Sequence, residues 1–127
     1  MSLAVSNHVR AVRGATTLDA DTVDQLDARV PELVQAMLDA NDVQIDDVIS
    51  IIFTSTPDVT AGFPASAARR LPLHDTPLLG AMEVPVRGAL ELCIRVLMYV
   101  ESPRGKAEIH HVFLHRAGSL RPDLAHD

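Results

Sequence analysis

The sequence predicts an α+β fold, a two-layer sandwich of the ferredoxin-like kind in which a four-stranded mixed sheet carries its helices on one face. Two long stretches, residues 22–40 and 86–100, repeat apolar residues at helical spacing. Four shorter stretches, residues 9–15, 48–54, 78–84 and 111–115, are rich in apolar and β-branched residues. The chain has 127 residues, enough for one domain with its own core, so we assign residues 1–127 to a single domain.

The stretch VRGALELCIRVLMYV, residues 86–100, is predicted to be the main helix of the fold. Its helical stripe is apolar, and residues on the opposite side are apolar too, which is typical of a helix buried all round. Arg95 stands among them, and a buried charge is costly unless it is paired. Two interpretations remain open: a salt bridge with Glu91, one helical turn back, or a site for an anion that is not part of the chain.

The other helices have recognisable start signals. Residues 22–40 follow Asp21, which is a good N-cap, and Asp24 would complete a start resembling a capping box. Pro31 interrupts this helix, so we expect a kink near residues 27–31 or a break into two segments. Residues 63–71, with a proline near the start, predict one short helix.

The residues of the predicted strands indicate that both faces of the sheet are buried. VISIIFT, residues 48–54, is almost wholly apolar and reads as a central strand buried on both faces. Helices on one face would leave the other face open, and we expect a second copy of the chain to cover it. Two charged residues interrupt apolar strands: Arg13 ends the apolar face of the first, and Glu83 is the one carboxylate of the third.

Composition excludes several classes of function. A net charge of −6 and 3% aromatic residues argue against a nucleic-acid partner. The single cysteine, Cys93, cannot form an internal disulfide, which fits a reducing cytosol. The sequence has no apolar run of transmembrane length and no signal peptide at its start, so we expect a cytoplasmic protein that does not bind membranes. It has no metal-ligand spacing and no phosphate loop, so we expect no metal and no cofactor.

The unusual charged residues suggest the chemistry. They are Arg13, Glu83 and Arg95, with Arg69 and Arg121 as further arginines. The sequence shows no nucleophile paired with a base. Arginines without a nucleophile favour binding of a carboxylated anion, and catalysis by positioning and electrostatics. Structural ion pairs among the same groups remain the alternative.

Six motifs in one order carry a family resemblance. They are VRGATT at residues 12–17, TSTPD at 54–58, FPASAAR at 63–69, the pair Met82-Glu83, CIRVLM at 93–98, and HVFL at 111–114 followed by LRPDL at 120–124. Together they resemble the monofunctional AroH class of chorismate mutases over about residues 9–124. The resemblance implies conversion of chorismate to prephenate by a pericyclic rearrangement, in the shikimate pathway to phenylalanine and tyrosine. It also implies a homotrimer that forms a pseudo-barrel, with active sites between neighbouring subunits.

The resemblance assigns roles to individual residues. Arg95 would contact the ether oxygen where negative charge develops, Glu83 would accept the substrate hydroxyl, and Arg13 would bind a substrate carboxylate. The further substrate contacts would be Leu79, Gly80, Ala81 and Met82 along the substrate, Phe63, Ala65, Ser66 and Arg69 from the adjacent subunit, and Phe113, Leu120 and Arg121.

The sequence departs from the family pattern at several of these positions. Phe113 stands where the family commonly has tyrosine, Ser66 where it has lysine, and Gly80 where it has cysteine. The loop at residues 71–77 is one residue shorter than in the family pattern. These departures concern substrate affinity more than reaction type. They leave two alternatives open: a catalytically weak chorismate-binding homologue, or a deaminase of the YjgF type on a similar trimeric fold.

Overall fold

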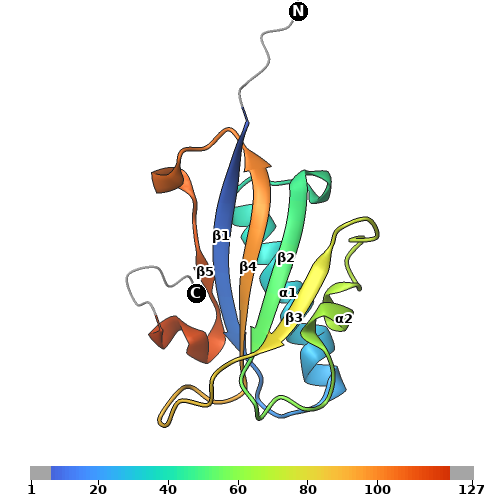
Figure 1. The fold of residues 1–127 in the computed structure, drawn as a ribbon, viewed down its shortest axis with the longest axis vertical. Coiled ribbons are helices and arrows are strands. Elements are labelled where there is room, and N and C mark those ends of the chain that lie inside the picture. The colour runs from blue at the N-terminus through green and yellow to red at the C-terminus, as the bar shows by residue number, and fades with distance from the viewer. Residues whose placement is uncertain (1–6, 121–127) are drawn as a thin grey trace, which may run out of the picture.

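The computed structural model describes residues 7–120 and forms one five-stranded mixed sheet with its α-helices on one side (Figure 1). The elements are β1 (His8–Thr17), α1 (Val23–Ala40), β2 (Val48–Ser55), α2 (Pro64–Ala68), β3 (Leu78–Met82), β4 (Cys93–Ser102) and β5 (Val112–Phe113), with short 3-10 helices η1 (Ile45–Asp47), η2 (Lys106–Glu108) and η3 (His115–Ser119). The sheet order is β3-β2-β4-β1-β5. β4 is antiparallel to both β1 and β2, whereas β3 is parallel to β2 and β5 is parallel to β1.

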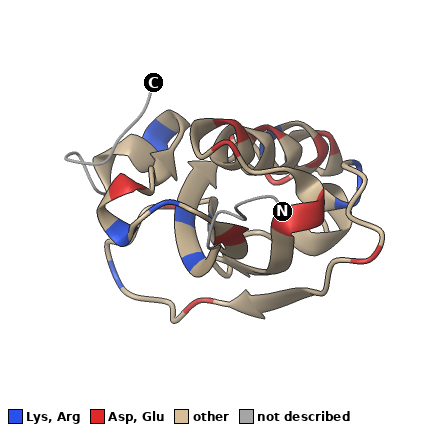
Figure 2. Ribbon diagram, turned by 90° about the horizontal axis from the view of Figure 1, so that it is seen from above, with Lys and Arg blue, Asp and Glu red and all other residues tan. Residues whose placement is uncertain are grey.

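Helix α1 builds the core against one face of the sheet, and Figure 2 shows both layers from above. Its buried residues are Leu26, Val30, Leu33, Val34, Met37 and Leu38. They share the core cluster with the inward-facing residues of the central strands, among them Phe53, Ile94 and Met98. The predicted α+β fold with helices on one face is therefore confirmed. Within residues 7–120, no helix is long and apolar enough to cross a bilayer.

The prediction of a main helix at residues 86–100 is wrong. Residues 86–92 form an irregular loop, and the rest belongs to the central strand β4, which gives the sheet five strands instead of four. In β4 the buried residues Ile94, Val96, Met98 and Val100 alternate with more exposed ones. Because both faces of this strand are largely apolar, its period-two pattern also fits a helix that is apolar all round.

The start of α1 also differs from the prediction. The N-cap is Thr22, whose hydroxyl accepts the N–H of Gln25 at 3.1 Å. Asp21 instead accepts the backbone N–H groups of Thr60 and Ala61, both at 2.9 Å, and so ties the start of α1 to the loop before α2. Of the kink or break expected near Pro31, the break does not occur: α1 is one helix from Val23 to Ala40 with Pro31 inside it.

The predicted strands are confirmed with small changes in their ends. β3 stops at Met82, so Glu83 lies just beyond the strand, and β5 has only two residues. The predicted short helix is confirmed as α2, with Pro64 at its first turn.

The second face of the sheet has no helix over it within the described residues. One row across this face runs Leu79, Ile52, Leu97 and Arg13, each paired with the next in the strand register. Leu79 is 63% exposed and Ile52 and Leu97 are only partly buried, so apolar side chains remain open on this side.

Candidate active site

A second row of paired residues crosses the open face of the sheet and brings the predicted site residues together. From the β3 edge to the β5 edge it runs Ala81, Thr54, Arg95, Ala15 and Phe113. Directly paired residues of neighbouring strands point to the same face. The five strands therefore present these side chains side by side.

Glu83 enters this row from beyond the end of β3. Its backbone N–H donates to the carbonyl of Ser55 at 2.9 Å, which holds the chain beside β2. The hydroxyl of Thr54 donates to Glu83 Oε2 at 2.6 Å, and Arg95 Nε lies 3.4 Å from Glu83 Oε1. Arg95 therefore pairs with Glu83, and the alternative of a helical pair with Glu91 is wrong.

Arg95 is not enclosed between two packed surfaces, as the helical interpretation required. Its side chain is 44% exposed, whereas that of Glu83 is 18% exposed. The Arg95 side chain is therefore accessible to a ligand, while the Glu83 side chain beside it is largely shielded.

Arg13 and Phe113 form the other end of the site. The Arg13 guanidinium carbon lies 5.9 Å from the centre of the Phe113 ring, a cation–π distance. Phe113 is only 3% exposed and packs in a small cluster with Ala15 and Ala117, against Leu90 and Leu120. The aromatic ring thus supports the arginine from below.

Arg13, Arg95 and Phe113 lie around a cleft of about 580 Å³. It is lined by Arg13, Gly14, Ala15, Ile52, Thr54, Arg95, Val96, Leu97, Phe113 and Leu120. Two guanidinium groups with one carboxylate nearby favour a small anion that also carries a hydrogen-bond donor. Sequence reasoning missed Thr54, and the one signal for it was a hydroxyl residue at the end of an otherwise apolar strand.

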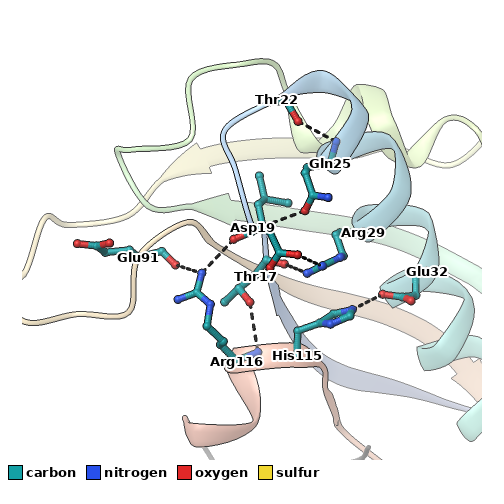
Figure 3. A network of polar contacts seen from close by, with 10 residues as sticks. Thr17, Asp19, Thr22, Gln25, Arg29, Glu32, Glu91, His115 and Arg116 are labelled. Atoms are coloured by element: carbon teal, nitrogen blue, oxygen red, sulfur yellow. Dashed lines mark hydrogen bonds and ion pairs between the residues drawn. The ribbon is translucent and has the colours of Figure 1, made fainter.

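A polar network fixes the segment that carries Leu120 to the cleft (Figure 3). The backbone N–H of Arg116 donates to the Thr17 hydroxyl at 3.3 Å, and its guanidinium donates to the carbonyls of Leu18 at 3.0 Å and Glu91 at 3.4 Å. His115 Nε2 lies 2.7 Å from Glu32 Oε1 on α1. η3 is thereby attached to α1 and to the loop that precedes β4, a connection that the sequence did not reveal.

A second clamp fixes the start of β4. Asp58 accepts the N–H of Leu92 at 2.9 Å and the hydroxyl of Thr56 at 2.5 Å. Thr56 also exchanges backbone and hydroxyl hydrogen bonds with Cys93. Burial raises the pKa of the Cys93 thiol, which keeps it in the protonated form that is a poor nucleophile.

The remaining predicted residues do not meet the cleft within one chain. Phe63, Ala65, Ser66 and Arg69 lie on or beside α2, and none of them lines it. Phe63 is 77% exposed beside a different hollow of about 350 Å³, which Gly80, Ala81 and Met82 also line. The Arg69 guanidinium donates to the carbonyl of Leu73. Arg121 lies outside the described residues.

The part of the chain that the structure describes has no cluster of three or more His, Cys, Asp or Glu side chains positioned for a metal ion.

Comparison with known proteins identifies the family. The sequence matches the family described as chorismate mutase type I over residues 9–124. Chorismate mutase AroH of Thermus thermophilus is 44% identical over 117 residues, which cover 91% of this chain and 96% of that protein. Chorismate mutase AroH of Bacillus subtilis strain 168 is 36% identical over 118 residues, covering 92% and 93% respectively. The structure of a chorismate mutase from Clostridium thermocellum matches with a TM-score of 0.84 and 44% identity, covering 86% of this chain and 97% of that one. With a cleft lined by Arg13 and Arg95 and the Glu83 carboxylate beside Arg95, the chain belongs to the type I, AroH-class chorismate mutases.

Proposed function

We propose that this protein catalyses the rearrangement of chorismate to prephenate in the cleft lined by Arg13 and Arg95, with Glu83 held beside Arg95, as an isomerase of aromatic amino-acid biosynthesis. The observation that carries the proposal is the row of Thr54, Arg95 and Phe113 on one sheet face, with Glu83 held against it. The family match covers residues 9–124, which sets aside the deaminase alternative.

The reaction makes modest demands on the protein. One C–O ether bond breaks as one C–C bond forms within the same molecule, with no proton transferred to or from the protein. The enzyme must hold the substrate in a reactive conformer and place donors where negative charge grows. A nucleophile is not required.

Arg95 is proposed to stabilise the ether oxygen as the C–O bond breaks. Its guanidinium is accessible from the cleft, and the Nε–Glu83 contact fixes the plane of the group. A fixed donor costs little reorganisation when charge develops, which is the main source of electrostatic catalysis. Its effect is larger where water is excluded.

Glu83 and Arg13 are proposed to orient the substrate. The Glu83 carboxylate would accept the substrate hydroxyl, and the Arg13 guanidinium, supported on Phe113, would bind a substrate carboxylate. Leu120 would close the side of the cleft beside Phe113.

We further propose that the cleft is completed by a neighbouring copy in a homotrimer that forms a pseudo-barrel. The open face carries exposed apolar residues such as Leu79 and Val9, which are 63% and 61% exposed. Exposed Phe63, with Ala65, Ser66 and Arg69, would then supply contacts to the site of the next subunit. Such contacts would use surface that a single chain leaves in water.

A direct assay tests the activity. Purified protein is mixed with chorismate, a chelator and no added cofactor, and the absorbance of chorismate is followed. We expect turnover. Binding of chorismate without turnover would instead support the weak homologue that the substitution at Phe113 suggests, and neither binding nor turnover would refute the proposed substrate.

Subunit sharing has its own test. Light scattering at micromolar protein should give the mass of three chains. Arg95→Ala and Arg69→Ala chains, each inactive alone, should regain activity when refolded together, because some sites would combine Arg95 of one chain with Arg69 of another. An active monomer, or no recovery in mixed assemblies, would contradict the shared site.

A further inference from the structure

We propose that Thr54 is a positioning residue, whose hydroxyl fixes the Glu83 carboxylate toward the cleft. This rests on the proposed function of Glu83, and it adds a residue that the resemblance does not assign. Thr54 Oγ1 donates to Glu83 Oε2 at 2.6 Å. That distance lies in the range of a charge-assisted O–H···O bond, which is stronger than a bond between neutral groups.

Glu83 needs such support because the strand ladder ends before it. β3 stops at Met82, and the residues that follow form an irregular loop up to β4. The bond from Glu83 N to Ser55 O places the backbone, yet it leaves the long side chain free to rotate. Unless something restrains it, a glutamate side chain retains considerable rotamer entropy.

Arg95 alone cannot supply that restraint during the reaction. Arg95 touches Oε1 of the carboxylate at 3.4 Å, and it is also the proposed partner of the substrate ether oxygen. A residue that binds only the Glu83 carboxylate, and is not needed to bind the substrate, would keep the carboxylate in place while Arg95 contacts the substrate. Thr54 meets this requirement because its hydroxyl binds the opposite oxygen, Oε2.

The position of Thr54 is itself rigid. It lies in β2, which is hydrogen-bonded to β3 on one side and β4 on the other, directly between Ala81 and Arg95. Its β-branched side chain has few accessible χ1 rotamers. The hydroxyl is therefore directed by the sheet rather than by a mobile loop.

The test compares Thr54→Val, which replaces the hydroxyl by a methyl group of similar size, with Thr54→Ser, which keeps it. We expect Thr54→Val to lower kcat/KM about tenfold or more, since small misplacement of an orienting group is costly, and Thr54→Ser to retain most activity. In a Glu83→Gln background the valine change should have little further effect. Such non-additivity is the mark of two residues acting as one unit.

A matched control is Thr16→Val in β1. The Thr16 hydroxyl is buried and has no hydrogen-bond partner among the described residues, so the same chemical change should leave kcat/KM near that of the unmodified chain. A wild-type kcat/KM in Thr54→Val would overturn the proposal. The proposal would also be overturned if the kcat/KM of the double variant fell by the product of the losses caused by Thr54→Val and Glu83→Gln alone.

A structural readout separates this proposal from the activity. In a crystal structure of Thr54→Val, the Glu83 carboxylate should rotate away from its present place or occupy more than one conformer. An unchanged carboxylate would refute the positioning role even if chorismate is turned over. A displaced carboxylate in a protein that never acted on chorismate would leave the positioning role intact and refute only the proposed substrate.

Discussion

Arg95 and Glu83 pair across an intervening strand: Arg95 lies on β4, Glu83 lies just beyond β3, and β2 runs between them. The contact joins Nε to Oε1 at 3.4 Å. Two residues that are twelve positions apart in sequence thus meet only because the sheet places β2 between β3 and β4. The accessible Arg95 side chain and the shielded Glu83 side chain fit the ligand-binding role that we propose for this pair.

Arg95→Lys should lower kcat about a hundredfold or more, the magnitude typical for removal of one placed donor. Lysine keeps the charge but loses the planar group that can contact Glu83 and the ether oxygen together. The loss should fall mainly on kcat, because the ether oxygen gains its charge only in the transition state. Steady-state kinetics with chorismate measures it.

The control for Arg95 is Glu91→Gln. Within the described residues, Glu91 contacts Arg116 through its backbone carbonyl, so loss of its carboxylate should leave catalysis nearly unchanged. Full activity of Arg95→Lys would return Arg95 to a structural role and remove the proposed mechanism.

Phe113→Tyr should lower KM with a smaller change in kcat. Phe113 lines the cleft beside Arg13, so a hydroxyl added to its ring could reach a substrate carboxylate. One hydrogen bond to a charged group is worth about 1.5 to 3 kcal/mol at most. The carboxylate is charged in both ground and transition states, which is why binding should gain more than rate. An unchanged KM would mean that the new hydroxyl does not face the substrate.

The fold class was predictable because most elements have one unambiguous period. α1 has a clear helical stripe, and β1 and β2 are rich in β-branched residues with defined ends. β4 was not predictable in this way, because residues such as Leu97 and Tyr99 keep its open face apolar too. A strand whose faces are both apolar and a helix that is apolar all round are difficult to separate by periodicity.

The same limit applies to the prediction of the candidate site. Arg13, Glu83 and Arg95 were identifiable as charges in apolar strands or stretches. In the structure Arg13 and Arg95 line one cleft, and Glu83 lies against Arg95. Thr54 and the Arg116 network depend on pairings between strands and loops far apart in sequence. Local patterns carry no information on such pairings, so only the folded chain reveals them.

Asp58→Ala should destabilise the fold by about 1 to 3 kcal/mol, since it removes the acceptor for a backbone N–H and a threonine hydroxyl. The N–H belongs to Leu92, which has a positive φ of 49° and depends on its surroundings to stay there. Asp58→Asn keeps one acceptor oxygen and should cost less. Urea unfolding at fixed protein concentration measures both.

The matched control for Asp58 is Asp39→Ala. Asp39 accepts a surface hydrogen bond from Gln35 one turn earlier on α1, so its loss should cost only a few tenths of a kcal/mol. Equal effects at the two positions would show that the Asp58 clamp contributes nothing beyond an ordinary surface contact.

Gly14→Ala should destabilise the protein by about 1 to 3 kcal/mol, the usual cost of overpacking a core. Gly14 lies in β1 under α1, and an added Cβ would lie 2.4 Å from Met37 Sδ and 3.2 Å from Leu33 Cδ1. The Met37 side chain can move, so Met37→Ala in the same chain should reduce the penalty of the added methyl.

Gly62→Ala is the control, because its new Cβ would meet only Leu26 Cδ1 at an ordinary 3.5 Å. Since Gly14 follows Arg13 directly, any shift of β1 should also raise KM for chorismate. Unaltered stability and KM in Gly14→Ala would show that α1 and β1 are packed more loosely than these distances require.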